Sequence, residues 1–328
     1  MKNAAAGDLM FTLTELQQRP AAIVGLGQIG MSWAAYFAAR GFAVRATDPD
    51  PEAAGRTRAY VAKVWPVLVE LGLVTPAGAP DRISFHATVT EAVAGCGWIQ
   101  ENAPEVEALK IELLAQIDAA AEAGAIIASS TSALAMSVMQ SACTRPQRCL
   151  TAHPFNPPHL VPLVELVGGK ATAPAALDLA ADFYRAIGRE PIRLRREIYG
   201  HVANRLQYVI FNEAARLVLD GVASVEDVDR AITWGPGMRW PFVGPFMTFH
   251  MAGGDAGMAG AFAKFAARDA SSTDRSKRIS LGEQERGQLH DGACAAQQGL
   301  SMQALEARRD RLLVELLKVK AEIAALGN

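Results

Sequence analysis

The segment that most constrains the fold of this chain is residues 21–48, where a strand, a glycine turn, a helix and a second strand follow one another. Residues 21–25 (AAIVG) form a short apolar run typical of a buried parallel strand, and GLGQIG at residues 25–30 follows directly. The alanine-rich segment after it predicts a helix that ends at Gly41, and residues 42–47 predict a second strand. This order predicts the beginning of a doubly wound α/β sheet.

Each glycine of the turn has a physical purpose if a dinucleotide binds there. Gly25 allows a tight turn, Gly27 lets the backbone approach a pyrophosphate, and Gly30 lets the helix pack closely on the strand. Gln28 and Ile29 begin the predicted helix, whose free N–H groups attract phosphate. A lone GxGxxG is a weak signal and also occurs as a turn in other α/β proteins, but its position between a strand and a helix favours a dinucleotide site.

Asp48, directly after the second predicted strand, indicates which dinucleotide binds. Its carboxylate can accept hydrogen bonds from both hydroxyls of an adenosine ribose and would repel a 2′-phosphate. Arg45 could favour a 2′-phosphate, but it comes before Asp48 within the strand. We therefore predict NAD rather than NADP as the cofactor.

Polar side chains follow three further predicted strands at the ends that face the ligand in doubly wound sheets. Glu101 and Asn102 follow one strand, the hydroxyls of residues 130–132 (STS) follow the next, and His153 ends a third. The hydroxyls alone are equally typical of turns and helix caps. The convergence of these groups on one edge predicts a ligand site.

His153 and Glu165 lie in an apolar and proline-rich segment, residues 151–167 (TAHPFNPPHLVPLVELV). The prolines at 154, 157, 158 and 162 argue against a simple strand and predict a nearly rigid frame for the two side chains. A histidine oriented by a buried carboxylate is a common general base near neutral pH. The alternative is a core histidine with a structural hydrogen bond; the position of His153 at the ligand edge favours the base.

After residue 198 the pattern becomes helical only, so we predict three parts. They are an N-terminal extension (1–19), a dinucleotide-binding domain of the Rossmann type (20–198) and an all-helical domain (199–328). Residues 266–300 predict a polar loop, and residues 301–326 an amphipathic helix. Aromatic side chains gather between residues 234 and 250, as either a domain core or a pocket for an apolar or cationic group.

The balanced composition excludes some partners. The chain has 328 residues, of which 50% are hydrophobic, and its net charge is −2. This composition predicts a soluble protein without a nucleic-acid or membrane partner. The 4 cysteines have no metal-ligand spacing, which predicts no metal site and free thiols in the cytoplasm. The start of the chain does not resemble a signal peptide.

Together these motifs resemble the 3-hydroxyacyl-CoA dehydrogenase family over nearly the full length of the chain. The similar segments are GLGQIG, the Glu101-Asn102 pair, SSTSAL at residues 129–134, AHPFNPPHLVPLVELV, and GHVANRLQYVIFNEA at residues 200–214. The resemblance implies an NAD-dependent oxidoreductase in which His153 is the catalytic base and Glu165 its partner. It further implies that Ser132 and Asn204 bind the substrate's hydroxyl and the cofactor–substrate junction. It also implies that Glu101 and Lys110 contact the cofactor and that the helical domain forms a homodimer.

Within the family, AHPFNPP, WGPGMRW and GPFMTFHMAGG are similar to the branch that contains carnitine and gulonate dehydrogenases. The CoA enzymes usually have AHFFNP and a lysine-rich helix, whereas residues 52–73 here carry only scattered basic side chains. The resemblance therefore implies oxidation of the 3-hydroxyl of a small hydroxy acid, with carnitine preferred over gulonate or a 3-hydroxyacyl-CoA.

Carnitine carries a quaternary ammonium, which proteins hold on aromatic faces, and a carboxylate, which arginine binds. The predicted substrate site is Trp234, Arg239, Trp240, Phe246 and Phe249. A structural NAD-binding protein of the crystallin type is the non-enzymatic alternative, and the complete Ser–His–Glu–Asn set argues against it.

Overall fold

The computed structural model describes residues 10–238 and 300–325, with residues 240, 241, 244–246, 248 and 284 between them. It divides into two compact units, Met1–Val202 and Ala203–Asn328. Arg239, Phe249 and nearly all of the predicted loop at residues 266–300 lie outside the described residues.

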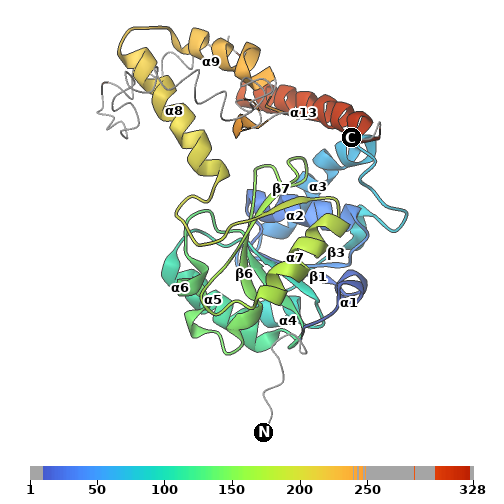
Figure 1. Cartoon of the computed structure of the whole chain (residues 1–328). Helices are drawn as coiled ribbons and strands as arrows, with labels where there is room; N and C mark the ends of the chain where they lie inside the picture. The colour runs from blue at the N-terminus through green and yellow to red at the C-terminus, as the bar shows by residue number, and fades with distance from the viewer. Residues whose placement is uncertain are drawn as a thin grey trace. The chain divides into compact units, whose positions relative to one another are not determined.

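The first unit is built on a single sheet that is mostly parallel (Figure 1). Within the described residues it has eight strands in the order β3 (Ile83–Phe85), β2 (Val44–Thr47), β1 (Ala21–Val24), β4 (Trp98–Glu101), β5 (Ile126–Ser129), β6 (Cys149–Pro154), β7 (Leu163–Gly168) and β8 (Glu190–Arg193). The strands β1 to β6 pair in parallel, β7 is antiparallel to β6, and β8 is parallel to β7. The strand order reverses between β1 and β4, which is the switch point where such sheets bind ligands.

Helices cover both faces of this sheet, as its apolar strands require. In β1, Ala21 and Ile23 join one buried cluster while Ala22 and Val24 join the other, because successive side chains point to opposite faces. The first cluster contains α1 (Leu13–Gln18), α2 (Gln28–Ala39), α3 (Ala53–Glu70) and α7 (Pro174–Ala186). The second contains α4 (Val89–Val93), α5 (Glu107–Ala120) and α6 (Met136–Met139). The predicted doubly wound sheet is confirmed.

An aromatic stack and two hydrogen bonds connect α7 to the ligand edge of the sheet. The indole of Trp98 on β4 stacks on Phe183 of α7, with ring centroids 4.0 Å apart. Two residues further along β4, the buried Gln100 accepts a hydrogen bond from the Tyr184 hydroxyl (2.7 Å) and donates to Ser130 Oγ (2.9 Å). The packing of α7 therefore helps to fix the loop that follows β5.

The prediction against a strand in the proline-rich segment is wrong for its second half. Strand β7 runs from Leu163 to Gly168 and pairs with β6 from Val164 to Gly168. Pro154 is the last residue of β6, and Pro157, Pro158 and Pro162 lie in the connection. The prolines therefore avoid the ladder positions where a missing N–H would cost a hydrogen bond.

The described part of the second unit is helical. Its helices are α8 (Ala203–Leu219), α9 (Val225–Trp234) and α13 (Met302–Ala325), with the short 3-10 turn η4 (Pro236–Met238). The described residues of the first unit also form the 3-10 turns η1 (Pro80–Arg82), η2 (Gln140–Ala142) and η3 (Pro146–Arg148). Gly221, with φ of 70°, follows the end of α8, and the Ser224 hydroxyl caps α9 by accepting from Asp227 N (3.1 Å).

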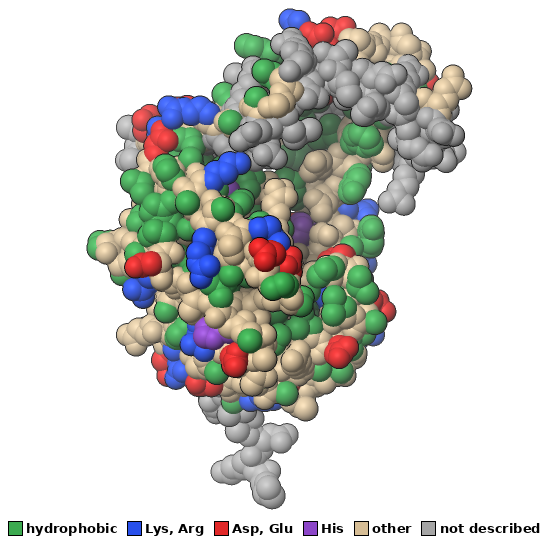
Figure 2. Space-filling model, turned by 180° about the vertical axis from the view of Figure 1, so that it is seen from behind, with side chains coloured by type: hydrophobic (Ala, Val, Ile, Leu, Met, Phe, Trp, Pro, Cys, Tyr) green, Lys and Arg blue, Asp and Glu red, His purple; other side chains and the backbone are tan. Residues whose placement is uncertain are grey.

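The surface mixes charges of both signs. Figure 2 shows Lys and Arg side chains interspersed with Asp and Glu side chains among apolar ones. Among the described helices, none combines the length and apolar character needed to cross a membrane.

Candidate active site

The glycine turn between β1 and α2 has the shape that a dinucleotide needs. Gly25 has φ of 89°, and a Cβ at Gly30 would lie 1.9 Å from the Gly25 carbonyl oxygen. A Cβ at Gly27 would meet nothing within 4 Å. Gly25 and Gly30 are therefore required by the turn itself, whereas the space over Gly27 is open to a ligand.

The helix that follows presents backbone N–H groups to this space. The first turn of α2 closes with the bond from Met31 N to Gly27 O (2.9 Å). The N–H groups of Gln28, Ile29 and Gly30 precede that bond and have no helical acceptor. Together with the helix dipole they form an anion-binding end suited to a pyrophosphate.

A pocket of about 700 Å³ opens beside this turn, at the carboxyl ends of β1 and β2. Gly25, Gly27, Asp48, Arg56 and Asn102 are among the residues that line it. Its size lies in the range of pockets that hold a cofactor. The open space over Gly27 and the acceptors of Asp48 fit the phosphates and adenosine ribose of NAD.

Asp48 is held ready at the end of β2. Its Oδ2 accepts from Leu26 N (2.6 Å) and its Oδ1 accepts from Asp50 N (2.9 Å), which leaves further lone pairs for hydroxyl donors. Arg45 donates instead to the Glu91 and Ala92 carbonyls at 2.7 and 3.2 Å, so its guanidinium is engaged away from the pocket. The Asp48 carboxylate, and not the Arg45 guanidinium, is therefore the charged group that an adenosine ribose in this pocket would contact.

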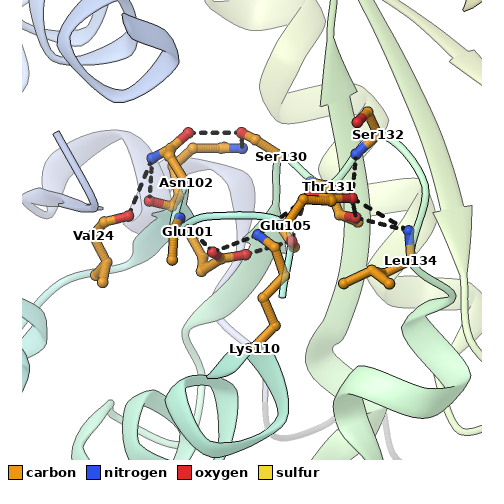
Figure 3. A network of polar contacts seen from close by, with 12 residues as sticks. Val24, Glu101, Asn102, Glu105, Lys110, Ser130, Thr131, Ser132 and Leu134 are labelled. Atoms are coloured by element: carbon orange, nitrogen blue, oxygen red, sulfur yellow. Dashed lines mark hydrogen bonds and ion pairs between the residues drawn. The ribbon is translucent and has the colours of Figure 1, made fainter. Parts of the chain in front are cut away.

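Glu101 and Lys110 form a buried ion pair behind the ligand edge (Figure 3). Lys110 Nζ lies 2.7 Å from Glu101 Oε1, and the two side chains are 1% and 0% exposed. Ala103 N and Ser129 Oγ also donate to Glu101, at 2.6 and 2.5 Å. Neither member of the pair lines the 700 Å³ pocket, so their contact with cofactor, predicted from the resemblance, stays a prediction.

Glu105 is a residue of this edge that the sequence analysis missed. One oxygen, Oε1, accepts from the Thr131 hydroxyl and from the backbone N–H groups of Ser132 (3.0 Å) and Ala133 (2.9 Å) (Figure 3). The second oxygen, Oε2, lies 3.8 Å from Lys110 Nζ. Glu105 therefore fixes the loop that carries Ser132. The contact joins residues 26 positions apart, so no local sequence pattern could have indicated it.

His153 and Glu165 face each other across two strands. They are directly paired in the antiparallel ladder of β6 and β7, so their side chains lie on the same face of the sheet. His153 Nδ1 lies 2.8 Å from Glu165 Oε2, with side chains 7% and 0% exposed. The second oxygen of Glu165 accepts from Val202 N (2.8 Å).

This geometry selects one tautomer of His153. Because Glu165 is an acceptor, Nδ1 carries the hydrogen and Nε2 has a free lone pair. No described residue provides a hydrogen-bond partner for Nε2. The arrangement is that of a histidine prepared to take a proton from a ligand.

The remaining predicted site residues belong to different elements, in both units. Ser132 follows β5 in the first unit, whereas Asn204 is in the first turn of α8 in the second unit. Of the predicted aromatic residues, Trp234 is 78% exposed, Phe246 is 82% exposed and Trp240 is 38% exposed. Their contact with a substrate stays a prediction.

Metal-ligand clusters and disulfides are both absent among the described residues. No group of three or more His, Cys, Asp or Glu side chains that could hold a metal ion occurs among the described residues. Cys96, Cys143 and Cys149 are free thiols, and burial raises the pKa of Cys96 to about 12, so it stays protonated.

The chain matches one family over both of its units. Residues 20–198 match the NAD binding domain of 3-hydroxyacyl-CoA dehydrogenase, and residues 200–286 match the C-terminal domain of the same family. The L-carnitine dehydrogenase of Streptomyces griseus is 45% identical over 93% of this chain and 91% of its own length. That of Bacillus cereus is 42% identical over 90% of this chain and 91% of its own.

Solved structures agree. The crystal structure of 5-formyl-3-hydroxy-2-methylpyridine 4-carboxylic acid 5-dehydrogenase, an NAD+-dependent dismutase, is 29% identical and superposes with a TM-score of 0.78 over 92% of this chain and 98% of its own. The first unit is thus an NAD-binding domain, and the protein is an NAD-dependent oxidoreductase acting on a CH–OH group. The chain belongs to the 3-hydroxyacyl-CoA dehydrogenase family.

Proposed function

We propose that this protein is an NAD-dependent L-carnitine dehydrogenase that oxidises the 3-hydroxyl of carnitine to the ketone. The observation that carries the chemistry is the His153–Glu165 pair, 2.8 Å apart, at the ligand edge of an NAD-binding sheet. The substrate is supported by the names of relatives that are 45% and 42% identical to the chain.

In the proposed mechanism, His153 Nε2 takes the proton of the substrate hydroxyl. Bound NAD supplies the acceptor for the hydride that leaves the same carbon. Glu165 keeps the proton of His153 on Nδ1 and, with its negative charge, stabilises the imidazolium that forms. Ser132 and Asn204 are proposed to hold the substrate oxygen against Nε2. General-base catalysis of this kind contributes about 10²–10⁴-fold in rate.

The trimethylammonium group of carnitine cannot donate a hydrogen bond, so its recognition depends on charge and on aromatic faces. The proposed cage includes Trp234, Trp240 and Phe246, each ring contributing roughly 0.5–2 kcal/mol. Trp234 and Phe246 are largely exposed in the second unit and thus available to a ligand. Arg239 and Phe249 complete the proposal from the sequence, with Arg239 on the carboxylate.

The experiment that tests this function is a substrate panel with purified protein. NADH formation is followed with L-carnitine, L-gulonate and L-3-hydroxybutyryl-CoA, each with NAD and with NADP. We expect turnover with L-carnitine and NAD at a kcat/KM well above the other pairs. Preference for gulonate or for the CoA thioester would reject carnitine, and no turnover with any substrate would reject the enzymatic proposal.

A base variant separates chemistry from cofactor binding. His153→Ala should lower kcat by about 10²–10⁴-fold because the proton acceptor is lost. The affinity for NAD, measured by NADH fluorescence, should stay unchanged. Near-wild-type turnover would mean that another group is the base.

We also propose that the two parts of the chain have separate functions and that the protein is a homodimer. The part at residues 20–198 binds NAD, while residues 199–328 supply substrate contacts and a homodimer interface. Apolar side chains on one face of α8 support the interface, since Leu206, Val209 and Ile210 are 54%, 66% and 38% exposed. The proposed location is the cytoplasm, supported by the free thiols of the described cysteines.

A further inference from the structure

His201 occupies an unusual backbone position next to the His153–Glu165 pair. Among the described residues it is the one non-glycine residue with positive φ, at 48°. It is also only 2% exposed. Histidine tolerates this conformation better than most side chains, but it still persists only where surrounding contacts demand it.

Two contacts of the imidazole account for this position. His201 Nε2 lies 3.1 Å from the carbonyl oxygen of Thr131, so Nε2 carries the hydrogen and donates. The ring lies over the ring of His153, with centroids 4.8 Å apart and planes tilted by 36°. One side chain thus contacts both the loop before Ser132 and the proposed base.

The backbone next to His201 holds the other member of the pair. Val202 N donates to Glu165 Oε1 at 2.8 Å. Gly200, on the other side, has φ of 74°. A turn of three residues, 200–202, therefore touches the histidine, the carboxylate and the loop that together make the candidate active site.

The imidazole of His201 is in an environment that keeps it neutral. Burial, followed by the charge of His153, lowers the pKa of His201, whereas the Thr131 carbonyl and the charges of Glu165 and Glu105 oppose this more weakly. Its Nδ1 is buried without a hydrogen-bond partner among the described residues, as is Thr151 Oγ1. Both residues line a cavity of about 220 Å³.

We propose that His201 is a positioning residue of the active site, which fixes the ring plane of His153 by stacking and the Ser132 loop by its bond to Thr131. A neutral ring is suited to this place, because His153 becomes an imidazolium during turnover and a second cation beside it would oppose that step. The inference rests on the proposed role of His153 as the base.

Three variants separate the two contacts. His201→Gly removes both contacts. Because glycine adopts a positive φ without strain, this substitution does not disturb the backbone conformation. His201→Phe keeps a ring for stacking but has no donor, and His201→Gln keeps an N–H that can reach the Thr131 carbonyl but has no ring. Arg196→Ala, at an exposed position of the same connection, is the control.

We expect His201→Gly to lower kcat by about 10²-fold, since small displacements of catalytic groups cost that much. Its KM for NAD should change by less than about twofold, because the cofactor pocket is untouched. The Phe and Gln variants should each recover part of the rate, and the control should equal the wild type. Wild-type kcat in a folded His201→Gly protein would overturn the proposal, as would a loss matched by a fall in the folded fraction at the assay temperature.

A spectroscopic measurement makes the test independent of the substrate. With ¹⁵N-labelled histidine, the wild-type spectrum should contain the His201 ring as the neutral Nε2–H tautomer and a downfield His153 Nδ1 proton bonded to Glu165. That downfield signal should broaden or disappear in His201→Gly and persist in His201→Phe. An unchanged signal in His201→Gly would reject the positioning role even if carnitine proves not to be the substrate.

Discussion

At the scale of single residues, Glu165 is distinguished by what its two oxygens accept. One receives the Nδ1–H of His153 and the other receives the backbone N–H of Val202, each at 2.8 Å. Both partners are donors, and the carboxylate is fully buried. A glutamine at this position has only one acceptor oxygen, so it cannot serve both.

We therefore predict that Glu165→Gln impairs catalysis and stability together. The amide NH₂ would face either the Val202 N–H or the His153 ring, which leaves a buried donor unpaired at a cost of about 1–3 kcal/mol or drives His153 into the wrong tautomer. Measurement of kcat alongside denaturant unfolding tests this. Wild-type behaviour in both would mean that the two hydrogen bonds to Glu165 are unimportant.

His201 leads to a prediction about acid stability. Its pKa is lowered in the folded protein by burial and by His153, from an ordinary value of 6.5. As the pH falls through about 6.5, this histidine binds a proton in the unfolded chain but remains neutral in the folded protein. The unfolded state is therefore favoured at low pH, and the free energy of unfolding decreases. His201→Phe lacks this proton-linked loss.

The measurement is the Tm of both proteins at about pH 7.5 and about pH 5.5, on either side of the ordinary histidine pKa. The variant should lose fewer degrees than the wild type between the two conditions. An equal loss would show that protonation of His201 is not linked to unfolding.

At the scale of elements, the glycine turn offers a matched pair of substitutions. A Cβ at Gly30 would lie 1.9 Å from the Gly25 carbonyl, whereas a Cβ at Gly27 would meet nothing within 4 Å. Gly30→Ala should thus destabilise the fold by about 1–3 kcal/mol through overpacking. Gly27→Ala should leave the Tm nearly unchanged and raise the Kd for NADH about tenfold or more, because the methyl group occupies the path of the pyrophosphate.

Thermal unfolding and NADH fluorescence titration check both variants. The opposite pattern, a stable Gly30→Ala and a Gly27→Ala with wild-type NADH affinity, would mean that the pyrophosphate does not bind over this turn.

The elements also show which parts of the structure a sequence can predict. The strands β1, β4 and β5 are continuous apolar runs bounded by turns, and their positions followed from that pattern. The strand β7 was missed because the nearby prolines suggested an irregular loop, although none of them occupies an interior position of that ladder.

The residues of the candidate site also fall into two groups, those that the sequence could predict and those that it could not. His153 and Asp48 could be predicted because each directly follows or ends a recognisable strand. Glu105 and His201 could not, because their functions depend on tertiary contacts with residues 26 to 29 and 70 positions away, respectively. The resemblance suggested cofactor contact for Lys110, whereas the structure adds its burial with Glu101, which no sequence periodicity would indicate.

At the scale of the whole molecule, the exposed apolar face of α8 predicts the state of assembly. Leu206, Val209 and Ile210 follow the three- and four-residue spacing of one helix face in the second unit, and they are 54%, 66% and 38% exposed. A monomer rarely leaves such a cluster in water, so we expect a homodimer.

Light scattering after gel filtration tests this prediction. Val209→Glu should shift the wild-type dimer towards the monomer, because a charge in an apolar interface costs several kcal/mol. Val69→Glu, at a 55% exposed position on α3, is the matched control and should leave the mass unchanged. A monomeric wild type, or a dimer in both variants, would exclude this face as the interface.

The direct pairing of His153 with Glu165 has an evolutionary consequence. In an antiparallel ladder two residues stay opposite each other whatever the length of the connection between the strands, which here lies between Pro154 and Leu163. Insertions in that connection should thus be tolerated, while a single inserted residue inside either strand would turn the carboxylate to the opposite face. Relatives with longer connections could keep the same chemistry, and a search that requires the histidine and the glutamate to be twelve positions apart would overlook them.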